Sequence, residues 1–171
     1  MLIKTAFLLG NLAPDASTAK QSTHYYAGRH EDLTRRLDIE QYWTDSAEAD
    51  HSYRLGYYCH LVADEIWLQG FYKGWLKQVI TKNPAKQAMY YADFDAYNAR
   101  LAQRLDLFDF ESLRDHATDE LRELVAKVER EAQATVEGTY TIFFPHQLDG
   151  YVDTCILRCR DMVRQKHEVI G

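Results

Sequence analysis

Apolar residues recur at helical spacing along almost the whole chain, and this repeat limits the fold more than any other feature of the sequence. Between Thr118 and Gly138, for example, apolar side chains are three or four residues apart. Only 8 of the 171 residues are glycine and 3 are proline, which favours long helices with few turns. The sequence therefore predicts an all-α fold, a single-domain multi-helix bundle that spans residues 1–171.

Cap and turn residues divide this pattern into segments. A short helix over residues 4–10 is expected to end at Gly10 and to be followed by a turn, NLAPD. Residues 139–144, TYTIFF, are the one stretch typical of a strand, and they are too isolated to build a sheet. Further helices are predicted over 29–43, over about 47–81, after the Asn83–Pro84 cap, from Thr118 to Gly138, and from Pro145 onward.

Charge and cysteine content exclude several classes of function. The net charge is −6 and there is no basic patch, which argues against binding of duplex nucleic acid or of an anionic membrane. A small phosphoester stays compatible with this charge, because a metal ion can supply positive charge. No apolar run approaches the roughly 20 residues of a transmembrane segment, and three cysteines do not predict a disulfide framework. We expect a cytoplasmic protein, with a homodimer among the options for its oligomeric state.

The stretch GYYCHLVADEIW is the most apolar in the chain, yet it contains His60 and Asp64. Residues four apart on a helix share a face, so these two side chains point to one place. A buried carboxylate needs a partner, which is either a metal ion or a hydrogen bond from His60. Gly56, one turn earlier, is expected to leave space above this face. A second pair at the same spacing, His116 and Glu120, lies in a polar stretch and needs no partner beyond water.

Two upstream residues add ligands of the same chemical kind. Asp15 follows Pro14 in the expected turn, where its side chain is free to point inward. His24 follows nine residues later, in the stretch STHYY. Singly, Asp15 is more often a turn residue and His24 more often a surface or hydrogen-bonded histidine, so the prediction rests on their joint occurrence. Two histidines and two aspartates suit zinc, and also manganese or iron.

Two further residues are candidates for proton transfer beside such a site. Glu65 is next to Asp64 but about 100° round the helix, so a supporting or surface role is the alternative. His146 begins the last expected helix and is a candidate acid–base residue or second ligand. Its alternative is a histidine at a helix start that faces solvent.

Three of these stretches together, GNLAPDA, STHYY and LGYYCHLVADEIW, resemble the bacterial zinc-dependent phospholipase C-like proteins. These belong to an all-helical superfamily that also contains zinc-dependent single-strand nucleases. The resemblance covers roughly residues 7–72. It implies phosphoester hydrolysis by a metal-activated water. It also implies that one metal ion, with zinc as the expected element, is held by Asp15, His24, His60 and Asp64.

The chain also departs from the catalytic members of this superfamily, which hold three metal ions. Their N-terminal Trp and nearby His have no counterpart after Met1, and Gly70 stands ten residues past His60, where a further His is expected. The leading helix of the smaller bacterial members, with its His, is expected to be missing or truncated. We therefore expect one four-ligand site rather than a three-metal cluster.

These observations predict a metal-dependent hydrolase of a small phosphoester, such as a phosphodiester or a phospholipid headgroup. The alternative is a non-catalytic helical domain that binds a partner or a small ligand. In that case a structural metal ion, or a buried His–Asp network, would hold two segments together. The two hypotheses differ in whether one coordination position stays open.

Overall fold

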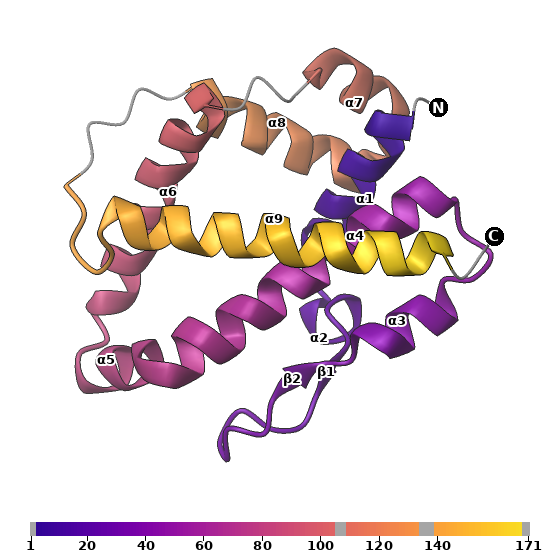
Figure 1. Cartoon of the computed structure of the whole chain (residues 1–171). Coiled ribbons are helices and arrows are strands. Elements are labelled where there is room, and N and C mark those ends of the chain that lie inside the picture. Colours follow the sequence, from indigo (N-terminus) through magenta and orange to yellow (C-terminus); the bar gives the residue numbers. More distant parts are fainter. Residues whose placement is uncertain (1–2, 105–108, 134–138, 169–171) are drawn as a thin grey trace.

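Helices form almost all of the computed structural model, which describes residues 3–104, 109–133 and 139–168 (Figure 1). The all-α prediction is confirmed. The only sheet in the described part of the chain is a two-stranded antiparallel ribbon, β1 (Tyr26–Ala27) and β2 (Arg36–Leu37). The helices are α1 (Ile3–Ala16), α2 (Lys20–Thr23), α3 (Ile39–Asp45), α4 (His51–Trp67), the π-helix η1 (Leu68–Leu76), α5 (Lys77–Lys82), α6 (Lys86–Arg104), α7 (Phe110–His116), α8 (Asp119–Gln133) and α9 (Pro145–Glu168).

Helices α1 and α4 cross so closely that their backbones touch. A Cβ atom on Gly56 would clash with the carbonyl of Phe7, and one on Gly10 would clash with the carbonyl of Tyr53. Asn11 adds a hydrogen bond from its Nδ2 to the Gly56 carbonyl, 3.2 Å long. The expectation that Gly56 leaves open space was therefore wrong, because the backbone of α1 fills that space.

Helix α1 also continues past the residue where it was expected to end. Gly10 lies inside the helix, and the helix runs through Pro14 to Ala16. Pro14 lacks an N–H group, so the helix loses one backbone hydrogen bond there without ending. Asp15 consequently lies on the last turn of a helix and not in a loop.

The predicted long helix over about 47–81 corresponds to α4, η1 and α5, which follow one another without a break. Residues 68–76 take π-helical geometry, and the Lys77 N–H donates to the Tyr72 carbonyl, five residues back. Such i→i+5 bonding is rare beyond a single turn and is frequent at functional sites. The buried core of the protein includes five residues of α4, which are Leu55, Tyr58, Cys59, Leu61 and Val62.

Two of the expected elements are absent from the structure. Helical spacing over 29–43 was misleading, because only Ile39–Asp45 is helical and Leu33 is exposed with a φ of 62°. Residues 139–144 are not a strand. Instead, the backbone N–H groups of residues 141–143 donate to the carboxylate of Asp93 on α6, at 2.6–2.9 Å. The predicted helix residues Leu105 and Gly138 lie outside the described residues.

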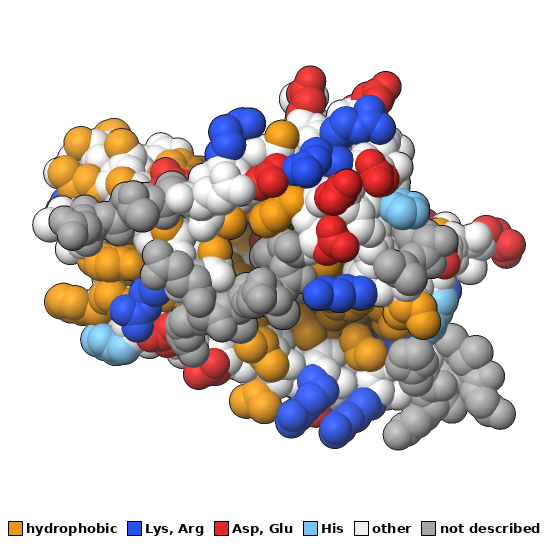
Figure 2. Space-filling view, turned by 90° about the horizontal axis from the view of Figure 1, so that it is seen from above, with side chains coloured by type: hydrophobic (Ala, Val, Ile, Leu, Met, Phe, Trp, Pro, Cys, Tyr) orange, Lys and Arg blue, Asp and Glu red, His pale blue; other side chains and the backbone are white. Residues whose placement is uncertain are grey.

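Helix α9 lies across the face of the bundle, with α6 beside its first residues and α3 beside its last (Figure 1). Basic and acidic side chains alternate over the face seen in Figure 2, without a large area of one sign. Within the described ranges, every helix is too short or too polar to cross a bilayer.

Candidate metal centre

The four predicted ligands come together where α1, the end of α2 and α4 meet. Asp15 lies on the last turn of α1, His24 directly follows α2, and His60 and Asp64 lie on successive turns of α4. The Nε2 atoms of the two histidines are 3.3 Å apart. The Asp64 Oδ2 atom is 3.3 Å from His24 Nε2 and 3.7 Å from His60 Nε2. The Asp15 Oδ1 atom is 3.5 Å from His24 Nε2, and the Asp15 Oδ2 atom is 4.0 Å from His60 Nε2.

These spacings match the edges of a coordination polyhedron. Zinc bonds of about 2.0–2.2 Å place neighbouring ligand atoms of a tetrahedron roughly 3.4 Å apart. The separations that involve a histidine, 3.3–4.0 Å, are therefore close to those of a site around one ion. Asp15, His24 and His60 each offer a ligand atom within 4.8 Å of the other two. The donor set of two nitrogens and two carboxylates suits zinc, manganese or iron(II).

The second ring nitrogen of His24 has a partner of its own, which orients its Nε2 atom toward the cluster. His24 Nδ1 is 3.1 Å from the hydroxyl of Thr23. Partners of this kind hold the imidazole of a metal ligand in one tautomer and one orientation. The backbone of Asn11 lies beside His60 and acts to raise the pKa of its imidazole.

Burial of His24 depends on the aromatic residues around it. Its side chain is 3% exposed, and its ring stacks on Tyr26 at 5.5 Å and 9°. The hydroxyl of Tyr57 on α4 donates to the carbonyl of Thr23, which holds the end of α2 against α4. The stretch STHYY therefore positions His24 through the residues on either side of it.

The protonation equilibria at the cluster favour a bound cation. Burial lowers the pKa of His60, so its imidazole is neutral and has a free lone pair near neutral pH. Burial acts to raise the pKa of Asp15, but hydrogen bonds with His24 and Lys20 outweigh it and hold this pKa well below the usual range. Burial raises the pKa of Asp64. The negative charge of Asp15 also acts to raise the pKa of Asp64, and a divalent ion would offset this repulsion.

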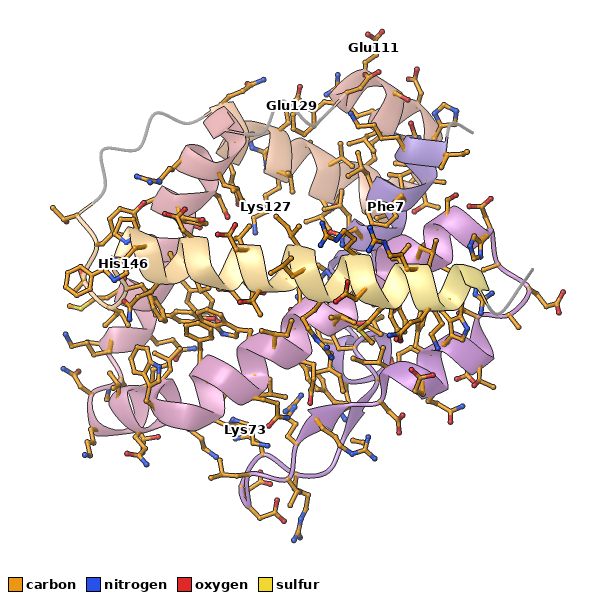
Figure 3. The ribbon with its side chains drawn as sticks, viewed as in Figure 1. Phe7, Lys73, Glu111, Lys127, Glu129 and His146 are labelled. Carbon is orange, nitrogen blue, oxygen red and sulfur yellow. The ribbon has the colours of Figure 1, made fainter. Side chains whose placement is uncertain are left out.

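Neither of the two residues considered for proton transfer lies at the cluster. Glu65 accepts a 2.9 Å hydrogen bond from the Leu37 N–H and a 2.8 Å bond from Gln69, so its carboxylate anchors the ribbon. His146 is exposed at the start of α9, where its ring stacks on Phe144 (Figure 3). His146 therefore lies where its alternative placed it, facing solvent at a helix start. Glu65 lies where a supporting residue is expected.

A cavity of about 480 Å³ opens beside the cluster. Asp15, His24 and Asp64 form part of its wall. The rest includes two basic side chains, Lys20 and Arg35, together with aromatic side chains of β1, α4, η1 and α6. Sequence reasoning missed these residues, because most of them are distant from the ligand motifs along the chain. The one available signal was the high number of tyrosines, 12 of 171 residues.

Comparisons with known proteins do not identify the chain or this site. No family model matches the chain, and neither a curated protein nor a solved structure matches it. The resemblance to the zinc-dependent phospholipase C-like proteins therefore stays a prediction from the sequence motifs.

Proposed function

We propose that this protein is a metal-dependent hydrolase of small phosphoesters, with zinc as the first candidate metal and manganese or iron as the others. The observation that carries the proposal is the cluster of Asp15, His24, His60 and Asp64 beside a ligand-sized cavity, whose wall includes all of them except His60. Pockets of about 300–1,000 Å³ are typical of small-molecule sites. Membership of the phospholipase C-like family, a cytoplasmic location and a homodimer stay predictions.

The orientation of the ligands supports a site that is open on one side. His24 and His60 are 3% and 13% exposed, whereas the carboxylates of Asp15 and Asp64 are 41% and 35% exposed. His60 is also absent from the cavity wall, so it lies at the back of the cluster. A ligand in the cavity would approach from the carboxylate side, and a carboxylate that binds through one oxygen leaves room for it.

Several groups of this chain would contribute to hydrolysis. A bound divalent ion supplies positive charge to a phosphoryl oxygen and lowers the pKa of water. Thr23 holds the imidazole of His24 in place. Aromatic side chains of the wall would contact the non-reacting part of a substrate.

The test is metal content together with activity. Protein purified without added metal is analysed by mass spectrometry, and hydrolysis of aryl phosphate monoesters and diesters is measured after loading with zinc, manganese or iron(II). We expect close to one metal ion per chain and loss of both metal and activity in His60→Ala. The matched control is His116→Ala, which removes an exposed histidine whose ring bonds its own helix at Ser112. Metal-loaded protein that cleaves none of these esters would contradict the proposal.

A structural role for the same cluster is the second candidate. The observation in its favour is that four protein ligands from three segments can complete a tetrahedral site and hold α1, α2 and α4 together. The protein would then be a non-catalytic domain that binds a partner or a small ligand. A metal-loaded protein without activity, whose melting temperature falls strongly on chelation, would favour this role over hydrolysis.

A further inference from the structure

We infer that the cavity beside the cluster selects a phosphate monoester dianion that carries a planar aromatic group. This inference rests on the proposed function and specifies its substrate class. The wall of the cavity combines two features that a metal site alone does not require. One is a pair of cationic side chains, and the other is a set of aromatic rings.

The charge balance favours a dianion. A divalent ion would balance the two carboxylates of Asp15 and Asp64. Lys20, which pairs with Asp15, and Arg35 would then give the metal-loaded cavity a net positive charge. Phosphate monoesters carry close to two negative charges above their second pKa of about 6. A phosphodiester carries one negative charge, and a headgroup with a quaternary ammonium adds a positive charge next to Lys20 and Arg35. The monoester is therefore the best electrostatic match.

Arg35 is the better placed of the two basic residues. Its guanidinium lies 3.7 Å from the centre of the Tyr26 ring and donates a 3.3 Å hydrogen bond to Gln21. No carboxylate among the described residues forms an ion pair with it, so its charge is available to a ligand. Guanidinium groups bind phosphate through two parallel hydrogen bonds, which gives Arg35 a defined geometry for this task.

The π-helix fixes the backbone at Arg35. The Arg35 carbonyl accepts hydrogen bonds from Lys73 at 3.2 Å and from Gln69 at 3.4 Å, both on η1. Figure 3 shows Lys73 pointing from η1 toward the ribbon. Tyr26 lies between Arg35 on one side and His24 on the other, so the cation is tied to the metal cluster through one ring.

Aromatic rings form much of the remaining wall. Trp67 at the end of α4 and Tyr90 on α6 are almost parallel, with ring centres 6.1 Å apart and an interplanar angle of 14°. Tyr91 follows with its ring 4.6 Å from that of Tyr90 and is 53% exposed. The hydroxyl of Tyr72 is held by His30 at 2.9 Å. Such surfaces favour planar groups that stack, such as an aryl ring or a nucleobase.

Catalytic selectivity is tested with three substrates on metal-loaded protein at pH 8. These are 4-nitrophenyl phosphate, bis(4-nitrophenyl) phosphate and 4-nitrophenyl phosphocholine. We expect the highest kcat/KM for the monoester. Arg35→Gln should lower it by roughly 10- to 100-fold, with a smaller loss for the diester. The control is Arg36→Gln, because Arg36 is exposed, pairs with Asp38 and does not line the cavity. A preference for the diester or the phosphocholine ester would overturn the inference.

Binding separates this inference from the proposed function. Affinities of phenylphosphonate and methylphosphonate for the metal-loaded protein are measured by calorimetry. We expect phenylphosphonate to bind more tightly, Arg35→Gln to weaken both, and Tyr91→Ala to weaken only phenylphosphonate, while Tyr91→Phe restores it. If this binding pattern is found but no ester is hydrolysed, the proposed hydrolase function is contradicted and the selectivity of the cavity is supported. Equal affinities for the two phosphonates, unchanged by Arg35→Gln, would overturn the inference even in an active enzyme.

Discussion

Asp93 and Asp64 are both acidic residues in an aromatic environment, but their surroundings give them different roles. Asp93 is 1% exposed, and its two oxygens accept three backbone N–H groups from residues 141–143. Asp64 is 35% exposed, faces the nitrogens of two histidines and lines a cavity. The comparison shows that depth of burial alone does not identify a functional carboxylate. The groups that contact the carboxylate are more informative. Backbone N–H donors satisfy a carboxylate permanently, whereas imidazole nitrogens leave it able to bind a cation.

The strongest test of this contrast is Asp93→Ala. Three backbone N–H groups would lose a charged acceptor in a buried position, so the free energy of unfolding should fall by about 3–5 kcal/mol. The metal content of the folded protein should stay the same, since Asp93 does not contact the cluster. Urea unfolding and metal analysis on one preparation measure both quantities. If Asp93→Ala keeps its stability but loses its metal, then Asp93 and not Asp64 would be the metal-binding aspartate.

Metal removal should affect the cluster around Asp64 and not the contacts of Asp93. A ligand present at 100 times its dissociation constant stabilises the folded state by about 2.7 kcal/mol, so chelation should lower the stability of the metal-loaded protein by a similar amount. Thermal unfolding with and without chelator checks this. The shift should disappear in Asp64→Ala. A shift of equal size in Asp64→Ala would show that the metal is bound elsewhere.

Gly56→Ala tests whether the helix crossing holds the cluster together. The added methyl group meets the backbone of α1 at Phe7, which cannot move aside as a side chain can. Overpacking of this kind typically costs about 1–3 kcal/mol, and displacement of α1 should also move Asp15 and weaken metal affinity. Gly70→Ala is the control, because a Cβ there meets no atom within 4 Å. Unchanged stability and metal affinity in Gly56→Ala would mean that α1 is not held by this contact.

The smallest expected effect on stability is that of Asp64→Ala in the metal-free protein. Burial disfavours the charged form of Asp64, so its removal should change the free energy of unfolding by less than about 1 kcal/mol. Metal content should nevertheless fall to background. Unfolding curves of the two metal-free proteins give the comparison. A large loss of stability would instead support a buried His–Asp network whose role is structural.

Sequence reasoning was most successful where the information is local. The fold class followed from apolar spacing within single helices. His60 and Asp64 were recognised as a pair because residues four apart on one helix share a face. It was least successful between helices. Helical spacing in 29–43 was outweighed by the ribbon, by the positive φ of Leu33 and by the anchoring of Leu37 to Glu65. The stretch 139–144 has strand-like composition, but the N–H groups that a sheet would bond are taken by Asp93.

The sequence by itself determined the helical class and the identities of the four metal-binding candidates, because periodicity and ligand type are properties of neighbouring residues. Only the tertiary structure brought Asp15 and His24 to α4, through the contact at Gly10 and Gly56 and the hydroxyl of Tyr57. It also brought Tyr26 of the ribbon and Tyr90 and Tyr91 of α6 to the wall of one cavity. These contacts join residues tens of positions apart, and their geometry depends on how whole helices pack, which no local pattern encodes.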